Sequence, residues 1–289
     1  MSITDIPPAV APPVAPEFPD TPTSPGAPTT SPWRDRLVAV LFGLLGLSVF
    51  VGFWAFVSWR NSDLPGPLDA FDELRSLLSD GFASSGPNGE GILRQLGDSL
   101  ELTMKGFGLA ALVGIPLGLA AGGNRRIWQA INPIVQLLKP VSPLAWFPIG
   151  LVAFKDSPKA ATFVVFITAL WPIVLNTAVG ASSVPADHRN VARVFHFSRL
   201  PYLRQVVVPH TMPSIITGLR VSMGIAWMVI VAAEMLSGSS GIGYFVWNSY
   251  NGGNLAAVMA AIIIIGVVGV VLDNIFVFAG KRYAAGGTE

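Results

Sequence analysis

Long uninterrupted runs of apolar residues dominate the pattern along this chain. A helix crosses the roughly 30 Å hydrocarbon core of a bilayer with about 20 apolar residues, and six runs reach that length. They are Leu37–Trp59, Leu100–Gly123, Ile127–Phe154, Ala160–Val184, Ile215–Met235 and Leu255–Gly280. All are too long and too continuous for barrel strands of about 10 alternating residues. The pattern predicts an all-α integral membrane protein with six transmembrane helices.

The runs also divide the chain into segments. We expect a first transmembrane helix over 33–60, an external segment over 61–98, a five-helix core over 99–282 and a short tail over 283–289. Residues 1–32 are rich in proline, which removes backbone donors, so they predict a disordered cytoplasmic tail. This tail is either a docking segment for a partner or a solvated extension.

The external segment carries its own periodic pattern. Its apolar residues at helical spacing are Leu68, Phe71, Leu74, Leu77 and Leu78. Acidic and basic side chains occupy the other face, which predicts a short amphipathic helix at the outer membrane surface. It would serve as a platform for an external partner or as an interfacial anchor in the lipid.

Composition supports the membrane class. The chain is 52% hydrophobic and 12% charged, against about 25% charged residues in soluble domains. The absence of cysteine excludes disulfides, thiolate metal sites and a cysteine nucleophile. No small-residue cleavage site follows the first apolar run, so we expect it to be retained. The net charge of +1 says little about partners, and no nucleic-acid partner is expected.

The basic residues predict the orientation, because Lys and Arg concentrate in short cytoplasmic connections. Arginines precede the first run at Arg34 and Arg36, and Arg125 and Arg126 separate the second run from the third. More arginines fill the connection before the fifth run, whereas the segment 236–254 has no charge. Both termini are therefore expected in the cytoplasm of a multi-pass protein of the bacterial cytoplasmic membrane.

The loop 185–213 combines basic residues with an apolar stripe. It predicts two short helices broken at Pro201, with Val191, Val194 and Phe195 forming an apolar patch beside arginines. Such a surface suits insertion into a groove on another protein. The alternative is ordinary cytoplasmic charge, which would not require the stripe.

This loop resembles the cytoplasmic EAA motif of importer-type ABC permeases. Asn190–Ala192 stand in its first positions, His196 stands where the family has glycine, and Val206–Pro209 match its Ile-x-Leu-Pro end. The glutamate and first alanine of the motif are replaced by Asn190 and Val191. Further blocks resemble the nitrate branch of the superfamily: Val191–Val194, Pro140–Trp146, Thr217–Arg220, Val231–Met235 and Gly241–Trp247. The similarity spans roughly residues 90–280.

The resemblance implies a type I ABC importer permease fold and a permease subunit for nitrate or nitrite. Two copies would form the pore as a homodimer, with two cytoplasmic ATP-binding subunits and an external or lipoprotein solute-binding protein. The partner subunits would bind ATP and Mg, because no Walker-type glycine loop occurs here. The chain is expected to be no enzyme and to carry no cofactor. The expected coupling residues are Asn190, Val191, Ala192, Arg193, Val194, Phe195, His196, Ser198 and Pro209.

Ionisable residues inside membrane spans are costly, which makes them candidates for the substrate pathway. Lys139 would lie near mid-membrane, where its ammonium could contact an anion or reach a carbonyl freed by neighbouring prolines. Those prolines predict a bent or partly unwound third span around Ser142 and Trp146. Glu234 is expected to accept hydrogen bonds from the Ser- and Gly-rich loop that follows it.

The remaining pathway candidates are aromatic. The external loop 237–253 would place Tyr244 and Trp247 over the pore as an outer gate, or in an aromatic belt at the membrane surface. Trp227 in the fifth span completes the set.

Several alternatives remain open at this point. The same architecture could import bicarbonate, cyanate or a sulfonate such as taurine. A self-sufficient channel or secondary transporter is a different class, but the six runs show no convincing inverted halves. An intramembrane enzyme would need clustered catalytic groups, and the spans offer only Lys105, Lys139, Glu234 and Asp273. The three histidines form no ligand pattern, so no metal site is expected.

Overall fold

The computed structural model describes residues 32–79, 81–82, 90–195 and 197–286. It divides into two units, 1–54 and 55–289, and each is considered by itself. Every regular element in the described residues is helical. The predicted proline-rich tail lies outside them, apart from Pro32, which begins helix α1 (Pro32–Arg60).

The described residues confirm the membrane class. Five helical stretches are long and apolar enough to cross a bilayer: Leu37–Arg60, Ile92–Gly123, Ser157–Ser182, Leu200–Ser237 and Leu255–Tyr283. A sixth crossing comes from two shorter helices if they count as one broken span. Helix α11 (Leu255–Gly286) continues past the predicted end of its run, so residues 283–286 of the expected C-terminal tail are helical.

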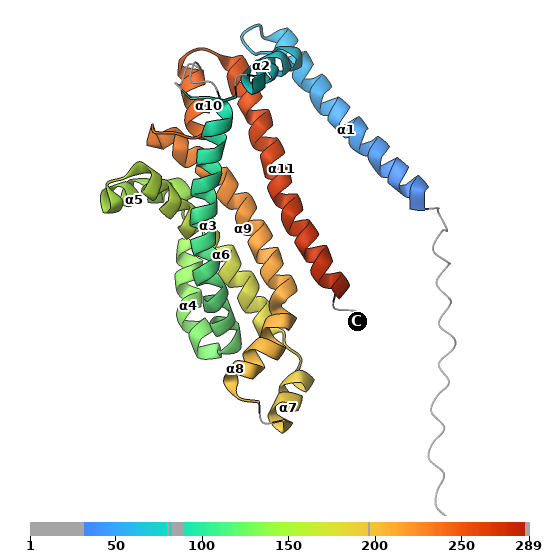
Figure 1. Ribbon diagram of the computed structural model, residues 1–289, viewed down its shortest axis with the longest axis vertical. Coiled ribbons are helices and arrows are strands. Elements are labelled where there is room, and N and C mark those ends of the chain that lie inside the picture. Colours follow the sequence, from blue (N-terminus) through green and yellow to red (C-terminus); the bar gives the residue numbers. More distant parts are fainter. Residues whose placement is uncertain (1–31, 80, 83–89, 196, 287–289) are drawn as a thin grey trace, which may run out of the picture. The chain divides into compact units, whose positions relative to one another are not determined.

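Three long helices form the centre of the larger unit (Figure 1). Helix α6 (Ser157–Ser182) packs between α3 (Ile92–Gly123) and α9 (Val208–Ser237). Glycines on α3 allow it to approach α6 closely. A Cβ on Gly118 would lie 2.6 Å from the Thr177 Cβ, and one on Gly106 would lie 2.7 Å from the Thr162 carbonyl oxygen. Small residues at such contacts are the usual means by which membrane helices approach closely.

The third apolar run is broken. Helix α4 (Arg125–Leu138) ends before a short 3₁₀ turn η1 (Pro143–Ala145), and α5 (Trp146–Phe154) follows. The two parts are bent by 90°. This confirms the predicted bend, and Lys139 caps the end of α4 at the break. Pro140 and Pro143 lack the backbone N–H groups that would continue the helical hydrogen bonds of α4.

The loop 185–213 differs from its predicted form. Helix α7 (Ala186–Val194) ends well before Pro201, which lies in the first turn of α8 (Arg199–Tyr202). The break therefore precedes α8, because proline is tolerated in the first turn of a helix. A π-helical turn η2 (Leu203–Val207) follows, in which the Val208 N–H bonds to the Leu203 carbonyl. It joins α8 to α9 without a break.

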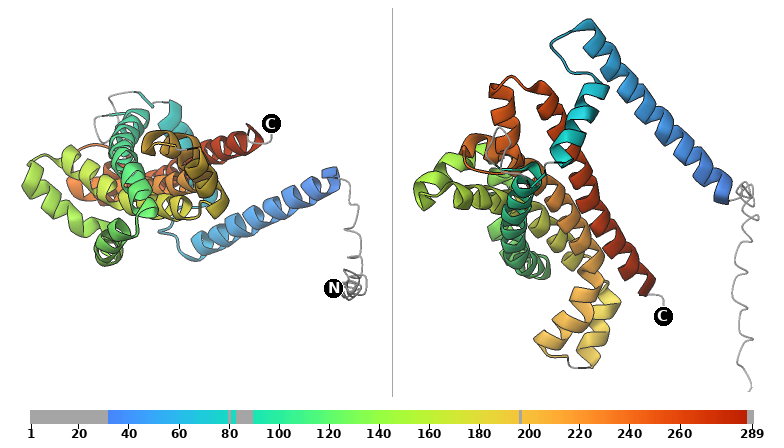
Figure 2. Two further views of the ribbon diagram at one scale, coloured as in Figure 1. Left: turned by 90° about the horizontal axis from the view of Figure 1, so that it is seen from below. Right: turned by 45° about the horizontal axis from the view of Figure 1, so that its top comes forward.

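Two shorter helices lie at the opposite end of this unit from α7 and α8 (Figure 2). The amphipathic helix predicted in the external segment is present as α2 (Pro67–Ser79), which packs on α11. The expected loop 237–253 is instead largely helical, since α10 (Ile242–Asn251) forms within it. Gly238 and Gly241 adopt φ angles of 63° and 109°, which turn the chain from α9 into α10.

Candidate functional site

A buried carboxylate holds the start of α10. The Glu234 side chain on α9 is 1% exposed. Its Oε2 accepts hydrogen bonds from the Ser99 hydroxyl at 2.8 Å and from the Gly243 N–H at 2.9 Å. The Ser99 oxygen in turn accepts the Ile242 N–H at 2.8 Å. These N–H groups lie in the first turn of α10 and have no partner within the helix, so the two side chains satisfy them.

The glycines around this contact leave just enough room for it. A Cβ on Gly241 would lie 2.2 Å from the Glu234 carboxylate carbon, and one on Gly243 would lie 2.0 Å from the Val231 carbonyl oxygen. The bond from Gly243 agrees with the expectation that Glu234 accepts from the segment after it. Ser99 was not predicted, and no local signal could have found it, because it is 135 positions away from Glu234.

A cavity of about 200 Å³ lies at the break between α4 and α5. Lys139 and Trp146 line it together with Trp171 from α6 and Ile225 from α9. Ser142 lies in the break and is exposed, but it is not part of the lining. Within the described residues, Lys139 makes no ion pair. The cavity thus combines a cation with apolar walls, which is suited to a small anion.

The aromatic candidates fall into two groups. Trp227 is 4% exposed, and its indole N–H donates to the Ile265 carbonyl on α11 at 3.0 Å, so it joins two helices. Tyr244 and Trp247 lie on α10, and the Trp247 ring stacks on Tyr250 with centroids 6.1 Å apart. The structure does not bring these three residues to the cavity beside Lys139.

The end of the unit formed by α7 and α8 presents an apolar surface. Val194, Phe195 and Leu200 are 73%, 70% and 72% exposed. Asn190, Ser198 and Pro209 are exposed as well. His196 lies outside the described residues, as do the side chains of Val191, Ala192 and Arg193, whose backbone belongs to α7.

The helix ends behind this surface contact one another. Val184 and Val207 belong to a separate apolar cluster that also includes Ala181. The Ser183 hydroxyl lies 3.2 Å from the His210 ring nitrogen, and the Tyr283 hydroxyl donates to the Pro209 carbonyl at 2.8 Å. These contacts join the ends of α6, α9 and α11 next to α7 and α8.

A charged pair joins α9 to α11 and was not predicted. The Arg220 guanidinium donates to both carboxylate oxygens of Asp273, at 2.6 and 2.7 Å. This bidentate geometry is the favourable one for arginine and a carboxylate. The sequence placed Arg220 and Asp273 in different spans but could not show that they face each other.

Comparison with known proteins agrees with this arrangement. A family model described as "Binding-protein-dependent transport system inner membrane component" matches residues 114–284. The nitrate import permease protein NrtB of Leptolyngbya laminosa is 43% identical over 81% of this chain and 84% of its own length. The bicarbonate transport system permease protein CmpB of Synechococcus elongatus is also 43% identical, over 84% of this chain and 88% of its own.

The fold has solved counterparts. A chain of the MetNI methionine ABC transporter in an inward-facing conformation aligns with a TM-score of 0.59 and 16% identity, over 68% of this chain and 96% of that one. Together, the helical arrangement and these matches define an integral membrane component of a solute importer. The chain belongs to the family of binding-protein-dependent transport system inner membrane components. It is a multi-pass ABC importer permease of the inner membrane and not an enzyme.

Proposed function

We propose that two copies of this chain form the pore of an ATP-driven importer of nitrate or nitrite, with bicarbonate as the second candidate substrate. The observation that carries the proposal is the cavity of about 200 Å³ that Lys139 lines among mostly apolar residues, since Lys139 has no ion pair in the part of the chain that the structure describes. The identity of 43% to a nitrate permease supports a small anion, and the same identity to a bicarbonate permease supports the second candidate.

The exposed apolar end at α7 and α8 supports the assignment of coupling. Val194, Phe195 and Leu200 lie on the part of the chain that carries the EAA-like motif, and an exposed apolar patch of this kind marks a protein interface. We assign this surface to contact with an ATP-binding subunit. Asn190, Val191, Ala192, Arg193, His196, Ser198 and Pro209 would lie in or beside this contact.

The outer end has a separate proposed role. Glu234 and Ser99 fix the first turn of α10, which carries Tyr244 and Trp247. In the proposed transporter, α10 forms the outer gate beneath the solute-binding protein. Glu234 therefore acts as a positioning residue for the gate and does not contact the anion.

Uptake of labelled nitrate and labelled bicarbonate, measured in cells that lack the native gene and carry either the wild type or a Lys139 variant, tests the proposal. The loss of one charge-assisted hydrogen bond costs about 1.5–3 kcal/mol, so we expect Lys139→Gln to lower the initial rate of uptake about tenfold or more. Lys139→Arg keeps the charge and should retain more uptake.

The two anions separate the two candidate substrates. Restored nitrate uptake that excess bicarbonate does not inhibit would assign nitrate, and the reverse pattern would assign bicarbonate. Unchanged uptake of the transported anion in Lys139→Gln would contradict the role of the cavity. Uptake of neither anion would contradict the proposed substrates.

A further inference from the structure

Helix α4 carries a line of polar side chains along one side. A helix with 3.6 residues per turn brings five of them within about a quarter of its circumference. These five residues form the polar stripe of α4: Arg125, Gln129, Asn132, Gln136 and Lys139. Asn132 is half-buried and the other four are exposed.

The other two sides of α4 are apolar, apart from Arg126 in the first turn. One side packs toward the core through Val135, which is fully buried, and through Leu138. The other side exposes Ile134 and Leu137, which are 52% and 70% exposed. A helix held only between protein and lipid needs a packed side and an apolar side, so the polar stripe requires a separate explanation.

The polar stripe lies at the depth of a membrane-spanning helix. Helix α4 runs back alongside the second half of α3, which is long and apolar enough to cross a bilayer (Figure 1). From Arg125 to Lys139 the helix rises about 21 Å at 1.5 Å per residue, against roughly 30 Å for the whole hydrocarbon core.

The amides of the stripe have no partner within the described part of the chain. There, the side chains of Gln129, Asn132 and Gln136 form no hydrogen bond. Polar groups that face hydrocarbon without a partner are costly. The polar stripe therefore faces water or another polar surface.

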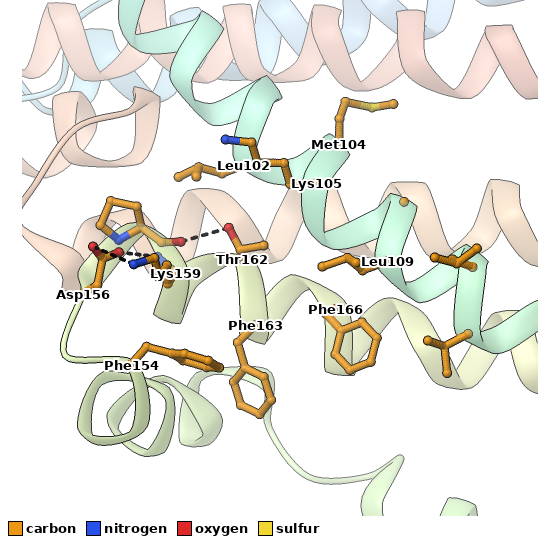
Figure 3. Close-up of a pocket in the computed structure, with 14 residues that line it drawn as sticks. Leu102, Met104, Lys105, Leu109, Phe154, Asp156, Lys159, Thr162, Phe163 and Phe166 are labelled. Atoms are coloured by element: carbon orange, nitrogen blue, oxygen red, sulfur yellow. Dashed lines mark hydrogen bonds and ion pairs between the residues drawn. The ribbon is translucent and has the colours of Figure 1, made fainter.

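A groove between α3, α5 and α6 shows how different an apolar surface of the same unit is (Figure 3). Leu109 of α3 and Phe166 of α6 line this groove, and α3 contributes only apolar residues to it from Gly108 to Val113. Over a comparable length, α4 presents five polar side chains.

Each end of the polar stripe carries a cation and lies at a cavity. Lys139 lines the cavity of about 200 Å³ at the break after α4, and Arg125 lines another of about 350 Å³ between α3, α4 and α6. Neither residue forms an ion pair with another described residue. Helix α4 has no acidic residue, and amide side chains supply N–H donors between the two cations. This chemistry complements an anion.

We infer that the polar stripe lines the cytoplasmic part of the anion pathway, from Lys139 to a mouth at Arg125. Water fills the space along the stripe, and the amide N–H groups of Gln129, Asn132 and Gln136 donate to the anion as it passes. The inference rests on the proposed function for the solute and on the predicted orientation for the direction. Water at the stripe can be measured independently of both.

The rate at which single cysteines react tests for this water, because the chain has no cysteine of its own. The stripe variants are Gln129→Cys, Asn132→Cys and Gln136→Cys. Leu137→Cys is the matched control, since it lies beside Gln136 at the same depth but on the exposed apolar side. Each full chain, purified with its ATP-binding subunits, is placed in lipid nanodiscs, where both membrane faces are accessible, and treated with a sulfonate-bearing methanethiosulfonate without nucleotide and with ATP.

We expect the three stripe variants to react about tenfold or more faster than Leu137→Cys in at least one of the two conditions. The reactive species is the thiolate, which forms in water and is suppressed in apolar surroundings. Addition of Lys139→Gln to Gln136→Cys should slow the anionic reagent more than a trimethylammonium-bearing one, because it removes a cation from the end of the stripe.

Uptake provides a second readout. Asn132→Leu keeps the approximate shape of the side chain and removes its N–H donors. The loss of a hydrogen bond to a charged solute should lower the initial rate of uptake about tenfold. Leu137→Met, on the apolar side, should leave uptake unchanged.

The outcomes separate this inference from the proposed function. Equally slow reaction of Gln136→Cys and Leu137→Cys in both conditions, in a chain that still transports its anion, would overturn the inference and leave the proposed function standing. Fast reaction along the stripe in a chain that takes up neither nitrate nor bicarbonate would support the water-lined stripe and contradict the proposed substrates. Stripe variants that stay unreactive but form disulfide-linked dimers would show that the stripe contacts a second copy of the chain.

Discussion

At the scale of single residues, the structure assigns Glu234 a bonding role. One oxygen of this buried carboxylate accepts from the Gly243 N–H and from the Ser99 hydroxyl. A buried donor left without a partner costs about 1–3 kcal/mol. Glu234→Ala should therefore loosen the first turn of α10, seen as faster hydrogen exchange at the N–H groups of Ile242 and Gly243. Glu234→Gln keeps an acceptor oxygen and should exchange more slowly than the alanine variant.

A matched control lies on the same helix. The Ser222 hydroxyl is also fully buried and donates to the Ala169 carbonyl on α6 at 2.8 Å, without a bond to α10. Ser222→Ala should lower the stability of the chain while leaving exchange at α10 unchanged. Hydrogen exchange at Ile242 and Gly243 that is as slow in Glu234→Ala as in the wild type would contradict the proposed role of Glu234 in holding the first turn of α10.

At the scale of elements, α7 and α8 and the turn between them expose apolar side chains, with Phe195 70% and Leu200 72% exposed. Burial of a valine side chain contributes about 1.5–3 kcal/mol, and a carboxylate in its place adds a desolvation cost. Val194→Asp should therefore lower co-purification of the ATP-binding subunits about tenfold or more and lower uptake with it. Pull-down of those subunits by the tagged chain measures the effect.

Leu68 provides the comparison for this variant. It is an exposed apolar residue on α2, at the other end of the unit from α7. Leu68→Asp makes the same kind of change there and should leave the ATP-binding subunits attached. If Val194→Asp retained those subunits fully, the assignment of this surface as the coupling contact would be contradicted.

At the scale of the whole molecule, the distribution of basic residues predicts which connections face the cytoplasm. The chain has no cysteine, so a single introduced cysteine reports one position without background. In spheroplasts, a membrane-impermeant maleimide should label Asp63→Cys, in the external segment, but not Arg125→Cys, at the start of α4. Both should be labelled after the membrane is permeabilised. Labelling of Arg125→Cys in intact spheroplasts would invert the predicted orientation.

Local pattern and tertiary contact contributed differently to these conclusions. The apolar runs predicted the crossings and the prolines predicted the bend after α4, since run length and missing N–H groups act within a few residues. The same local reasoning misplaced the break in the loop 185–213 and missed α10. In the first case a proline in the first turn was tolerated. In the second, a short helix is stabilised by groups from α3 and α9.

The sequence by itself determined that this is a helical membrane protein of the ABC permease family, because bilayer thickness and motif spacing are properties of short stretches of chain. Only the tertiary structure decided that Ser99 meets Glu234, that Arg220 meets Asp273, and that Lys139 and Trp171 line one cavity. An apolar run places a residue at a depth in the membrane, but the rotation of its helix and its neighbours are set by close contacts such as those at Gly106 and Gly118.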